Sequence, residues 1–498
     1  MIIRPIDFAI ILIYLAGITW FGMRFRRGQS SIKDYFLGGR TAPWWALAGS
    51  IVATETSTLT IISTPGIAFA GNLGFLQLVM GYLVGRVIIV LLFIPAYFRG
   101  EFYTAYQLIE KRFGARTKSV AAATFLLTRA LAEGVRINAI GKVVSVAFGT
   151  GTRISVAAIT ALTILYTFEG GMKAVIWTDV IQLCLYLTGS VTAFFILLHR
   201  VPGGWAEVSR VAAAAGGKLQ IFDFTFNLTR SYTFWSGLIG GTFLTMASHG
   251  TDQTMVQRLL AARSEGDSKK ALLASGVVVF IQFTLFLLLG VMLFALHQHA
   301  PLAIPEGDND RIFPAFVVTG MPPGISGLVL AAIFAVAMSN ASGSLNSLAS
   351  SSIIDFQVLR GRGAAALDQA RLFKLSRRVT IFWGILLGFL GILHWGTVLV
   401  AGLTIASITY GSMLGLFLLC LLNPRATARG SLLGMAAGLL TLVVIQGIGT
   451  GRLAVPDSMQ WVGRLAWTWY VLLGTAVTFL VGSIASLADN RKNAGTRI

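Results

Sequence analysis

The fold is decided by residues 50–66, which read SIVATETSTLTIISTPG. They lie inside a longer apolar run, 44–70, which as a helix is long enough to cross about 30 Å of hydrocarbon. Glu55 stands near the middle among serines and threonines, and Pro65 and Gly66 follow it. Because Pro65 and Gly66 follow the polar run, we predict that this membrane helix is broken. Its unwound carbonyls and hydroxyl side chains together offer the hard oxygen ligands that suit a small alkali cation. The alternative is an intact helix in which Ser and Thr bond back to the backbone.

The whole chain has the composition of a membrane protein. Of its 498 residues, 55% are hydrophobic and 12% are charged, which is too apolar for a soluble protein of this length. Apolar runs of membrane-spanning length must be helices, because a bilayer offers no partners to open backbone groups. About thirteen transmembrane helices are expected, at 7–23, 44–70, 75–97, 119–147, 154–168, 174–198, 233–253, 271–297, 325–353, 378–397, 399–423, 430–448 and 466–487.

The net charge of +19 is explained by topology. Most of the 39 lysines and arginines lie in alternate connections, for example in the segments 24–27 and 371–378. The positive-inside rule places these connections in the cytoplasm, the N-terminus outside and the C-terminus inside. We expect a multi-pass protein of the cell inner membrane whose partner is the lipid bilayer. No nucleic-acid surface and no obligatory protein partner is indicated.

A second broken helix is expected at 233–253, where Gly237, Gly240 and Gly241 lie close together. It comes five helices after the first broken helix. Two consecutive five-helix units have opposite orientations because five is odd, and paired interruptions in inverted repeats mark the midplane substrate site of secondary transporters.

The predicted architecture is therefore an all-α polytopic membrane protein with one transporter domain, residues 1–498. Two inverted five-helix repeats, 44–198 and 233–423, form its core. One helix precedes them and two follow.

Oxygen-bearing side chains also concentrate in the helix at 325–353. Ser339, Asn340 and Ser342 follow an apolar stretch, and residues three or four apart share one face of a helix. This stripe is suited to binding an ion. Alternatively, its small residues only allow close helix packing.

Charged residues lie inside the helix at 119–147. Arg129, Glu133 and Arg136 are spaced to share one face. Glu133 can pair with one arginine and leaves the other unbalanced, so Arg136 is our candidate for binding a carboxylate through its guanidinium group. Pairing within the helix is the structural alternative.

Four segments together resemble the sodium/solute symporter family, whose members have the LeuT-type fold. The most specific is YTFEGGMKAVIWTDVIQ at 166–182, which is similar to the family's Gly-Gly, Ala-Val and Trp-Thr-Asp signature. GTDQTMVQR at 250–258, the broken helix at 50–66 and SNASGSLNSLASSSIIDF at 339–356 also look like family segments, in the same order.

The resemblance implies a sodium site between the second and ninth helices. Its ligands would be the backbone carbonyls of Ala53, Thr56 and Val336 and the side chains of Ser339 and Asn340. Members of the family usually have Ser or Thr at the position of Asn340, so the geometry of the site differs here.

Some members have a second sodium site. The resemblance implies Asp179, Ser339 and Ser342 for it, whereas Gly343 lacks a hydroxyl that some of those members have. The alternative is that Asp179 is a structural carboxylate paired with Lys173.

Positions that match the family's central cavity give the candidate substrate site. Its residues are Glu55, Ser57, Thr60, Phe75, Gln77, Arg136, Asn138 and Trp235, with Tyr410 as a gate. If Arg136 faces this cavity, an acidic solute is favoured over a neutral one.

We therefore predict a sodium-coupled symporter that imports a small organic solute by alternating access, with Na⁺ as the coupling ion. An acidic sugar or a carboxylate is the favoured solute, and a neutral sugar or an amino acid remains open. The alternatives are a proton-coupled transporter of the same fold, with Glu55 or Glu133 as the carrier, and a transporter-like solute sensor. No constellation of an enzyme stands out.

Overall fold

The computed structural model describes residues 3–24, 37–100, 102, 104–166, 172–357, 369–393, 395 and 398–495. This part of the chain contains no β-strand, and a single bridge joins Ala42 and Ala262. The helices are α1 (Pro5–Met23), η2 (Gly38–Arg40), α3 (Trp44–Glu55), α4 (Thr58–Ala70), η3 (Leu73–Phe75), α5 (Leu76–Phe98), α6 (Tyr106–Phe148), α7 (Thr152–Tyr166), α8 (Met172–Arg200), α9 (Gly204–Ala214), α10 (Phe234–Gly250), α11 (Gln253–Leu260), α12 (Glu265–His299), η4 (Asn309–Arg311), α13 (Ile312–Gly320), α14 (Ile325–Gln357), α15 (Gln369–Ile392), α16 (Val398–Leu422), α17 (Ala428–Gly449), η7 (Asp457–Arg464), η8 (Trp467–Trp469) and α18 (Tyr470–Gly495).

Helices occupy each of the thirteen predicted stretches, which confirms the all-α prediction. In the described residues, six helices are long and apolar enough to cross a membrane, or up to eight if each of two bent pairs is one span. Shorter apolar stretches, such as Ile325–Ala337 within α14, fall below that length, and the bent pair of α6 and α7 joins two of the predicted spans.

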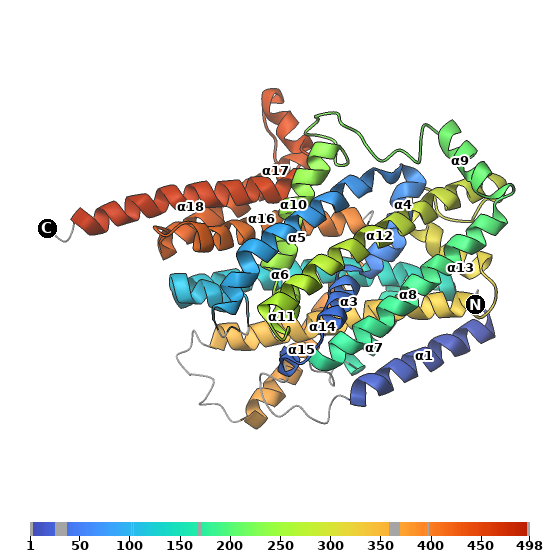
Figure 1. Cartoon of the computed structure of the whole chain (residues 1–498), viewed down its shortest axis with the longest axis horizontal. Helices are drawn as coiled ribbons and strands as arrows, with labels where there is room; N and C mark the ends of the chain where they lie inside the picture. Colours follow the sequence, from blue (N-terminus) through green and yellow to red (C-terminus); the bar gives the residue numbers. More distant parts are fainter. Residues whose placement is uncertain are drawn as a thin grey trace.

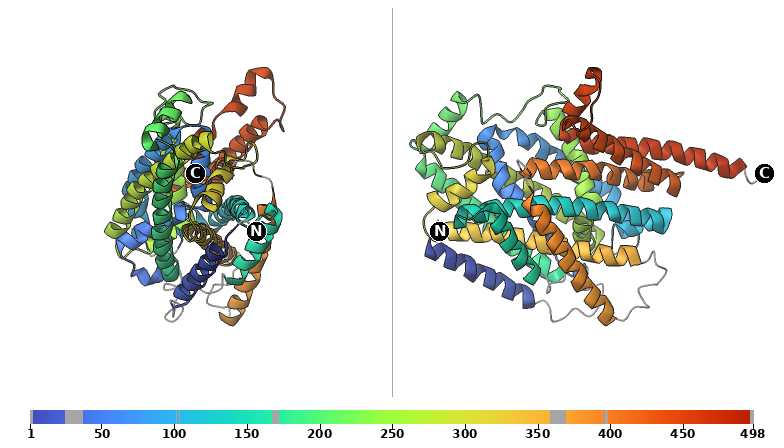
Figure 2. Two further views of the ribbon diagram at one scale, coloured as in Figure 1. Left: turned by 90° about the vertical axis from the view of Figure 1, so that its right-hand side faces the viewer. Right: turned by 180° about the vertical axis from the view of Figure 1, so that it is seen from behind.

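The helices pack as a bundle elongated along one direction. Figures 1 and 2 show α5, α12, α16 and α18 running roughly along the long axis, with the chain termini at opposite ends. α10 packs on α5, α12 packs on α3, α4 and α5, and α6 packs on α14 and α16. The elements that carried the sequence signals, α3, α4, α10 and α14, are therefore all inside the bundle.

The predicted break at the glycines of 233–253 is wrong in position. α10 runs unbroken through all three glycines and ends at Gly250, and Thr251 and Asp252 separate it from α11. The glycines serve close packing instead. A Cβ on Gly241 would meet the Leu78 carbonyl of α5, and a Cβ on Gly81 would lie 2.5 Å from the Leu238 carbonyl of α10. The two backbones touch because neither has a side chain there.

The second half of the broken helix is held in the same way. A Cβ on Gly66 would lie 2.7 Å from the Asn309 carbonyl of η4, and a Cβ on Gly290 of α12 would meet the Pro65 carbonyl. Pro65 lies inside α4 without ending it. The first helix break is therefore upstream of Pro65 and Gly66.

Candidate functional site

The first predicted break is present, at Thr56 and Ser57. α3 ends at Glu55, Thr56 has a ψ of 88° and Ser57 is extended, and α3 and α4 meet at a bend of 61°. This confirms the broken helix predicted from residues 50–66.

The break frees two backbone carbonyls. In a continuous helix the Ser57 amide would donate to Ala53, but here it donates to the Glu55 carbonyl at 3.0 Å. The Thr60 amide donates to Ser57 at 2.9 Å instead of to Thr56. The carbonyls of Ala53 and Thr56, both predicted sodium ligands, thus lose their normal helical donors.

Side chains hold the break in place. Gln282 of α12 donates through Nε2 to the Thr56 hydroxyl at 2.7 Å, and the Tyr186 hydroxyl of α8 donates to Oε1 of Gln282 at 3.1 Å. All three side chains are buried. Gln282 thus holds the Thr56 hydroxyl, and Tyr186 holds Gln282, so two neighbouring helices fix the backbone at the break.

α14 brings the other predicted sodium ligands. Val336 and Asn340 are buried on this helix. Nδ2 of Asn340 has no hydrogen-bond partner among the described residues. Ser339 and Ser342 are in the helix, but their side chains lie outside the described residues.

Asn340 lines a cavity of about 10 Å³, which is large enough for a single water or ion. Thr58, Glu133 and Arg136 line it too, so it lies where α4, α6 and α14 meet. The residue that departs from the family pattern is therefore next to the charged face of α6.

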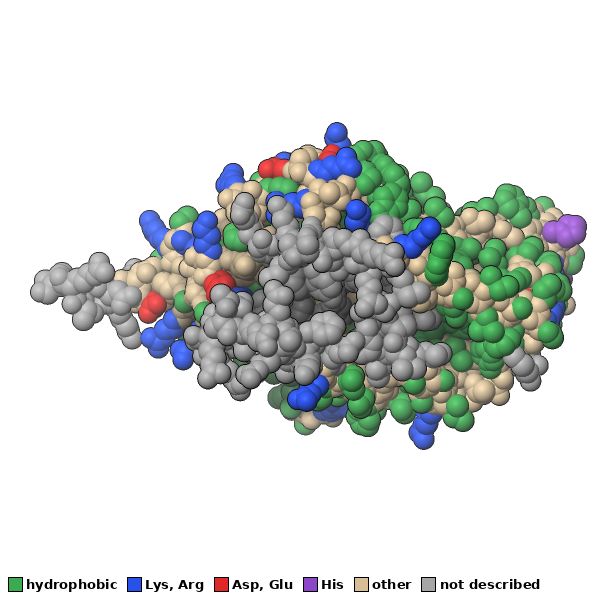
Figure 3. Space-filling model, turned by 90° about the horizontal axis from the view of Figure 1, so that it is seen from below, with side chains coloured by type: hydrophobic (Ala, Val, Ile, Leu, Met, Phe, Trp, Pro, Cys, Tyr) green, Lys and Arg blue, Asp and Glu red, His purple; other side chains and the backbone are tan. Residues whose placement is uncertain are grey.

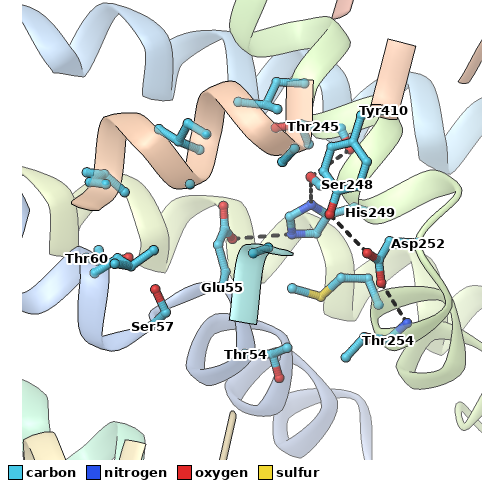
Figure 4. Close-up of a pocket in the computed structure, with 18 of the residues that line it drawn as sticks. Thr54, Glu55, Ser57, Thr60, Thr245, Ser248, His249, Asp252, Thr254 and Tyr410 are labelled. Atoms are coloured by element: carbon cyan, nitrogen blue, oxygen red, sulfur yellow. Dashed lines mark hydrogen bonds and ion pairs between the residues drawn. The ribbon is translucent and has the colours of Figure 1, made fainter. Parts of the chain in front are cut away.

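A larger cavity of about 130 Å³ lies beside the break. Figure 4 shows Glu55, His249, Asp252 and Tyr410 around it. Its walls come from α3, α4, η3, α5, α6, α10, α11, α12 and α16. The lining residues are Thr54, Glu55, Ser57, Leu59, Thr60, Phe75, Tyr82, Thr128, Arg129, Ala132, Arg136, Leu244, Thr245, Ser248, His249, Asp252, Thr254, Met255, Phe283, Leu399, Gly402, Leu403, Ala406 and Tyr410.

The α6 side of this cavity is cationic. Arg136 pairs with Glu133 at 3.1 Å, and Nε of Arg129 donates to Ser344, which in turn donates to Glu133 at 2.8 Å. One carboxylate thus balances two guanidinium groups. Nε of Arg136 is buried and has no partner among the described residues. Arg136 therefore lines the cavity, as predicted, and has capacity for another acceptor.

The opposite side, formed by α3, α5 and α10, carries a buried ion pair. Glu55 pairs through Oε2 with Arg86 of α5, and Nε2 of His249 lies 3.4 Å from the same oxygen. Arg86 is 1% exposed and also donates to the Tyr82 carbonyl and to Ser275. Glu55 therefore sits in the cavity wall as a compensated carboxylate.

Tyr410 of α16, the predicted gate, bridges to the loop after α10. Its hydroxyl donates to Oδ2 of Asp252 at 2.9 Å. Oδ1 of Asp252 accepts from the Thr254 amide at 2.8 Å and so caps α11. A rotation of Tyr410 would thus have to break a hydrogen bond to a fixed carboxylate.

Asp179 of α8 is 2% exposed and lies at an ion pair. Its Oδ2 accepts from Ser50 at 2.6 Å and from Nη2 of Arg258 at 3.0 Å. The sequence alternative named Lys173, but the charge partner is Arg258, which lies in the segment 250–258. A second cation at Asp179 would have to compete with this guanidinium.

Three predicted substrate residues lie outside both cavities. The Gln77 amide binds the carbonyls of Gly74 and Tyr232 and so joins α5 to the loop before α10. The Asn138 amide donates to the Gly391 and Leu393 carbonyls at the end of α15. Trp235 is 40% exposed and donates to Phe224. All three connect helices to loops.

Ser57, Thr60 and Phe75 line the larger cavity, with Phe75 stacked on Phe283. Sequence reasoning missed Arg86 and His249. Arg86 had a signal, because a charge in the middle of an apolar helix needs a partner. His249 had none, since its partner is far away in sequence.

The comparisons with known proteins agree with this geometry. A model of the sodium:solute symporter family matches residues 35–438. The sodium/sialic acid symporter SiaT of Proteus mirabilis is 30% identical over 458 residues, which cover 88% of this chain and 89% of that protein. The human sodium/iodide cotransporter is 30% identical over 443 residues, which cover 87% of this chain and 68% of that protein.

Solved structures show the same relationship. A substrate-bound, outward-open Na⁺-coupled sialic acid symporter matches with a TM-score of 0.84 and 28% identity, covering 97% of this chain and 98% of that chain. A transporter of the nucleobase-cation-symport-1 family matches with a TM-score of 0.56 and 13% identity, covering 92% of this chain and 94% of that chain, and so shares the fold alone.

A helical bundle with a broken helix beside a polar, buried cavity defines a secondary transporter. This chain belongs to the sodium:solute symporter family. The predicted LeuT-like fold and sodium-coupled solute symport are confirmed, with Na⁺ as the coupling ion.

Proposed function

We propose that the transported solute is a small organic acid, with an acidic sugar as the first candidate. The observation that carries this proposal is the α6 wall of the cavity, where one carboxylate balances Arg129 and Arg136. A guanidinium group binds a carboxylate through two parallel hydrogen bonds. Two relatives are sodium/sialic acid symporters, which supports the same class of solute.

Sodium binds, in this proposal, at the break between α3 and α4. The carbonyls of Ala53, Thr56 and Val336 and the side chains of Ser339 and Asn340 are its ligands. Two of these carbonyls have lost their helical donors, and carbonyl and hydroxyl oxygens are the ligands that a hard cation prefers. Asn340 lines the small cavity, and its amide oxygen is the ligand that this proposal assigns to it.

Arg136 joins the two sites. It lines the larger cavity and also the small one that Asn340 and Glu133 line. A solute carboxylate that binds Arg136 weakens the Arg136–Glu133 pair and makes the surroundings of Asn340 more negative. This favours sodium at the site to which Asn340 belongs, so solute and sodium stabilise one another's binding.

Transport then follows alternating access, in which the five-helix units 44–198 and 233–423 form the two repeats. The coupling is the difference in affinity between the outward and inward states. One Na⁺ with a monoanion carries no net charge, so a tenfold sodium gradient supplies about 1.4 kcal/mol and the membrane potential supplies nothing.

The N-terminus lies outside and the C-terminus in the cytoplasm of a cell inner membrane in this proposal. Figure 3 shows lysines and arginines mainly over the half of the molecule from which α18 projects, and hydrophobic side chains over the other half. The positive-inside rule assigns the basic end to the cytoplasm.

The test is uptake of labelled sialic acid into proteoliposomes under a sodium gradient. Arg136→Met should abolish uptake and Arg136→Lys should retain part of it, because Lys keeps the charge but not the bidentate geometry. Arg452→Met, at an exposed arginine in the loop after α17, is the matched control. Uptake that persists in sodium-free buffer under a pH gradient would show that protons can drive transport in place of sodium.

A further inference from the structure

The larger cavity has two chemically different sides. Arg129 and Arg136 line the α6 side, and Glu55 with His249 lines the side formed by α3, α5 and α10. Glu55 pairs with Arg86 and lies 3.4 Å from Nε2 of His249, while Arg136 pairs with Glu133. Each side is thus held by its own partners, and a solute between them meets a cationic wall and an acceptor wall.

Only one oxygen of Glu55 is used by the protein. Oε2 takes both Arg86 and His249. In the part of the chain that the structure describes, Oε1 takes part in no hydrogen bond, and Figure 4 shows the carboxylate beside His249 in the cavity wall. A carboxylate has about four acceptor sites, so Oε1 keeps its full capacity.

The carboxylate cannot turn away from the cavity. Arg86 is held at 1% exposure by the Tyr82 carbonyl and Ser275, and His249 is held through Nδ1, which lies 2.8 Å from Ser248 Oγ. These contacts fix Oε2 and, with it, the direction of Oε1. The acceptor is therefore preorganised before any solute arrives.

We propose that Oε1 of Glu55 is a second recognition subsite, which binds a hydrogen-bond donor of the solute. This rests on the proposed function, in which the solute's carboxylate binds the α6 wall. The solute class is therefore a carboxylic acid that also carries a hydroxyl or an amino group. Unsubstituted alkyl carboxylates are poor ligands, since they would desolvate Oε1 and leave it without a donor.

The test is a ligand series matched in carbon number, measured in sodium as a rise in melting temperature of the purified protein. Butyrate is compared with 3-hydroxybutyrate and with 4-aminobutyrate, and hexanoate with gluconate. We expect a substituted acid to bind about tenfold tighter than its alkyl partner, as for a hydrogen bond to a charged acceptor. Comparing 3-hydroxybutyrate with 4-aminobutyrate shows whether a hydroxyl or an amino group of the solute donates to Oε1.

A double variant tests the residue. Glu55→Gln with Arg86→Gln removes both charges of the ion pair together, so no buried charge is left alone. In this variant the affinities for the substituted acid and for its alkyl partner should differ by no more than about threefold. Glu265→Gln with Lys269→Gln, which removes a half-buried ion pair at the start of α12, is the control and should leave this affinity ratio unchanged.

The outcomes are separable. Equal binding of alkyl and substituted acids in the unaltered protein overturns the subsite, and so does a ratio that survives in a double variant still stabilised by sodium. The first of these does not depend on how the variant folds. If no carboxylate raises the melting temperature in sodium, the proposed organic-acid function fails, and the subsite fails with it.

Discussion

The ammonium group of Lys142 on α6 lies 3.1 Å from Oδ2 of Asp310 in η4, and the same oxygen accepts from the amide of Val398, the first residue of α16, at 3.1 Å. Asp308 accepts from Lys142 at 2.9 Å. The loop between α12 and α13 thus ties the end of α6 to the start of α16. Both helices line the larger cavity, so this connection restrains two of its walls.

Removing Lys142 is expected to be costly, because Asp310 is only 3% exposed. Lys142→Met should lower the free energy of unfolding by about 3–5 kcal/mol, as for a buried pair that loses one partner. Combining it with Asp310→Asn should recover part of the loss, with a coupling energy of about 1–3 kcal/mol. Unfolding in mixed micelles measures both, and strict additivity would contradict the pairing.

The same loop should make the stability of the protein depend on pH. Burial alone would raise the pKa of the Asp308 carboxyl, but hydrogen bonds from Lys142 and Arg311 and their charges outweigh it and hold the pKa below its usual value of 3.8. A lowered pKa means that the charged pair stabilises the fold above pH 3.8 and that this contribution is lost as the pH falls below it. Melting temperatures on either side of this pH should show the loss.

Asp308→Asn should flatten that dependence, and Asp457→Asn, at an exposed residue of η7, should leave it unchanged. A variant Asp308→Asn that still shows the full acid dependence would show that other carboxyls cause it.

Sodium binding should follow a single saturable phase. At the candidate second site Asp179 is paired with Arg258, so we expect Asp179→Asn to keep the sodium-dependent rise in melting temperature. The variant itself should lose about 3–5 kcal/mol of stability, since Arg258 is buried and would be left unpaired. A fall in sodium stoichiometry from two to one in this variant would instead establish the second site.

Asn340 should be a sodium ligand through its oxygen. Asn340→Val keeps a branched side chain but removes the oxygen, and it should weaken sodium binding by about tenfold. Asn340→Ser restores the hydroxyl usual in the family and should retain binding. Sodium titrations of melting temperature, with choline at equal ionic strength, distinguish the two. Equal sodium affinity in both variants would exclude the Asn340 side chain from the site.

The contact between α5 and α10 leaves no room for a methyl group. Gly241→Ala places a Cβ against the Leu78 carbonyl and should destabilise the protein by about 1–3 kcal/mol. Gly17→Ala is the matched control, because no atom lies within 4 Å of its Cβ. Equal stability of the two variants would show that α10 can shift without cost.

Much of the fold was predictable because its signals are local. Apolar length located the helices, and the polar run followed by Pro65 and Gly66 predicted the first broken helix, although the break itself lies upstream, at Thr56 and Ser57. The glycines of α10 led to a wrong prediction of a helix break. A glycine that makes the backbone flexible and a glycine that lets a neighbouring backbone pack closely look the same in a sequence. Only the position of α5 distinguishes the two roles.

The candidate site was predictable where one helix face carries it, as at Arg129, Glu133 and Arg136. Contacts between side chains of different helices were not predictable from the sequence. Arg258 rather than Lys173 pairs with Asp179, because α11 turns back toward α3 and α8. Gln77 and Asn138 were expected to line the cavity because of the resemblance to the family, but the side-chain amide of each donates to a backbone carbonyl of a neighbouring loop.

The burial of Arg86 has a consequence for how the chain enters the membrane. Its partners lie on α3, α10 and α12, and α12 is synthesised long after α5. An unpaired arginine in mid-membrane costs a few kcal/mol. Glu55 of α3, which pairs with Arg86, precedes α5 in the chain, so α5 can enter the bilayer with its arginine already compensated, and ribosome-bound chains that carry Glu55→Gln should hold α5 only loosely.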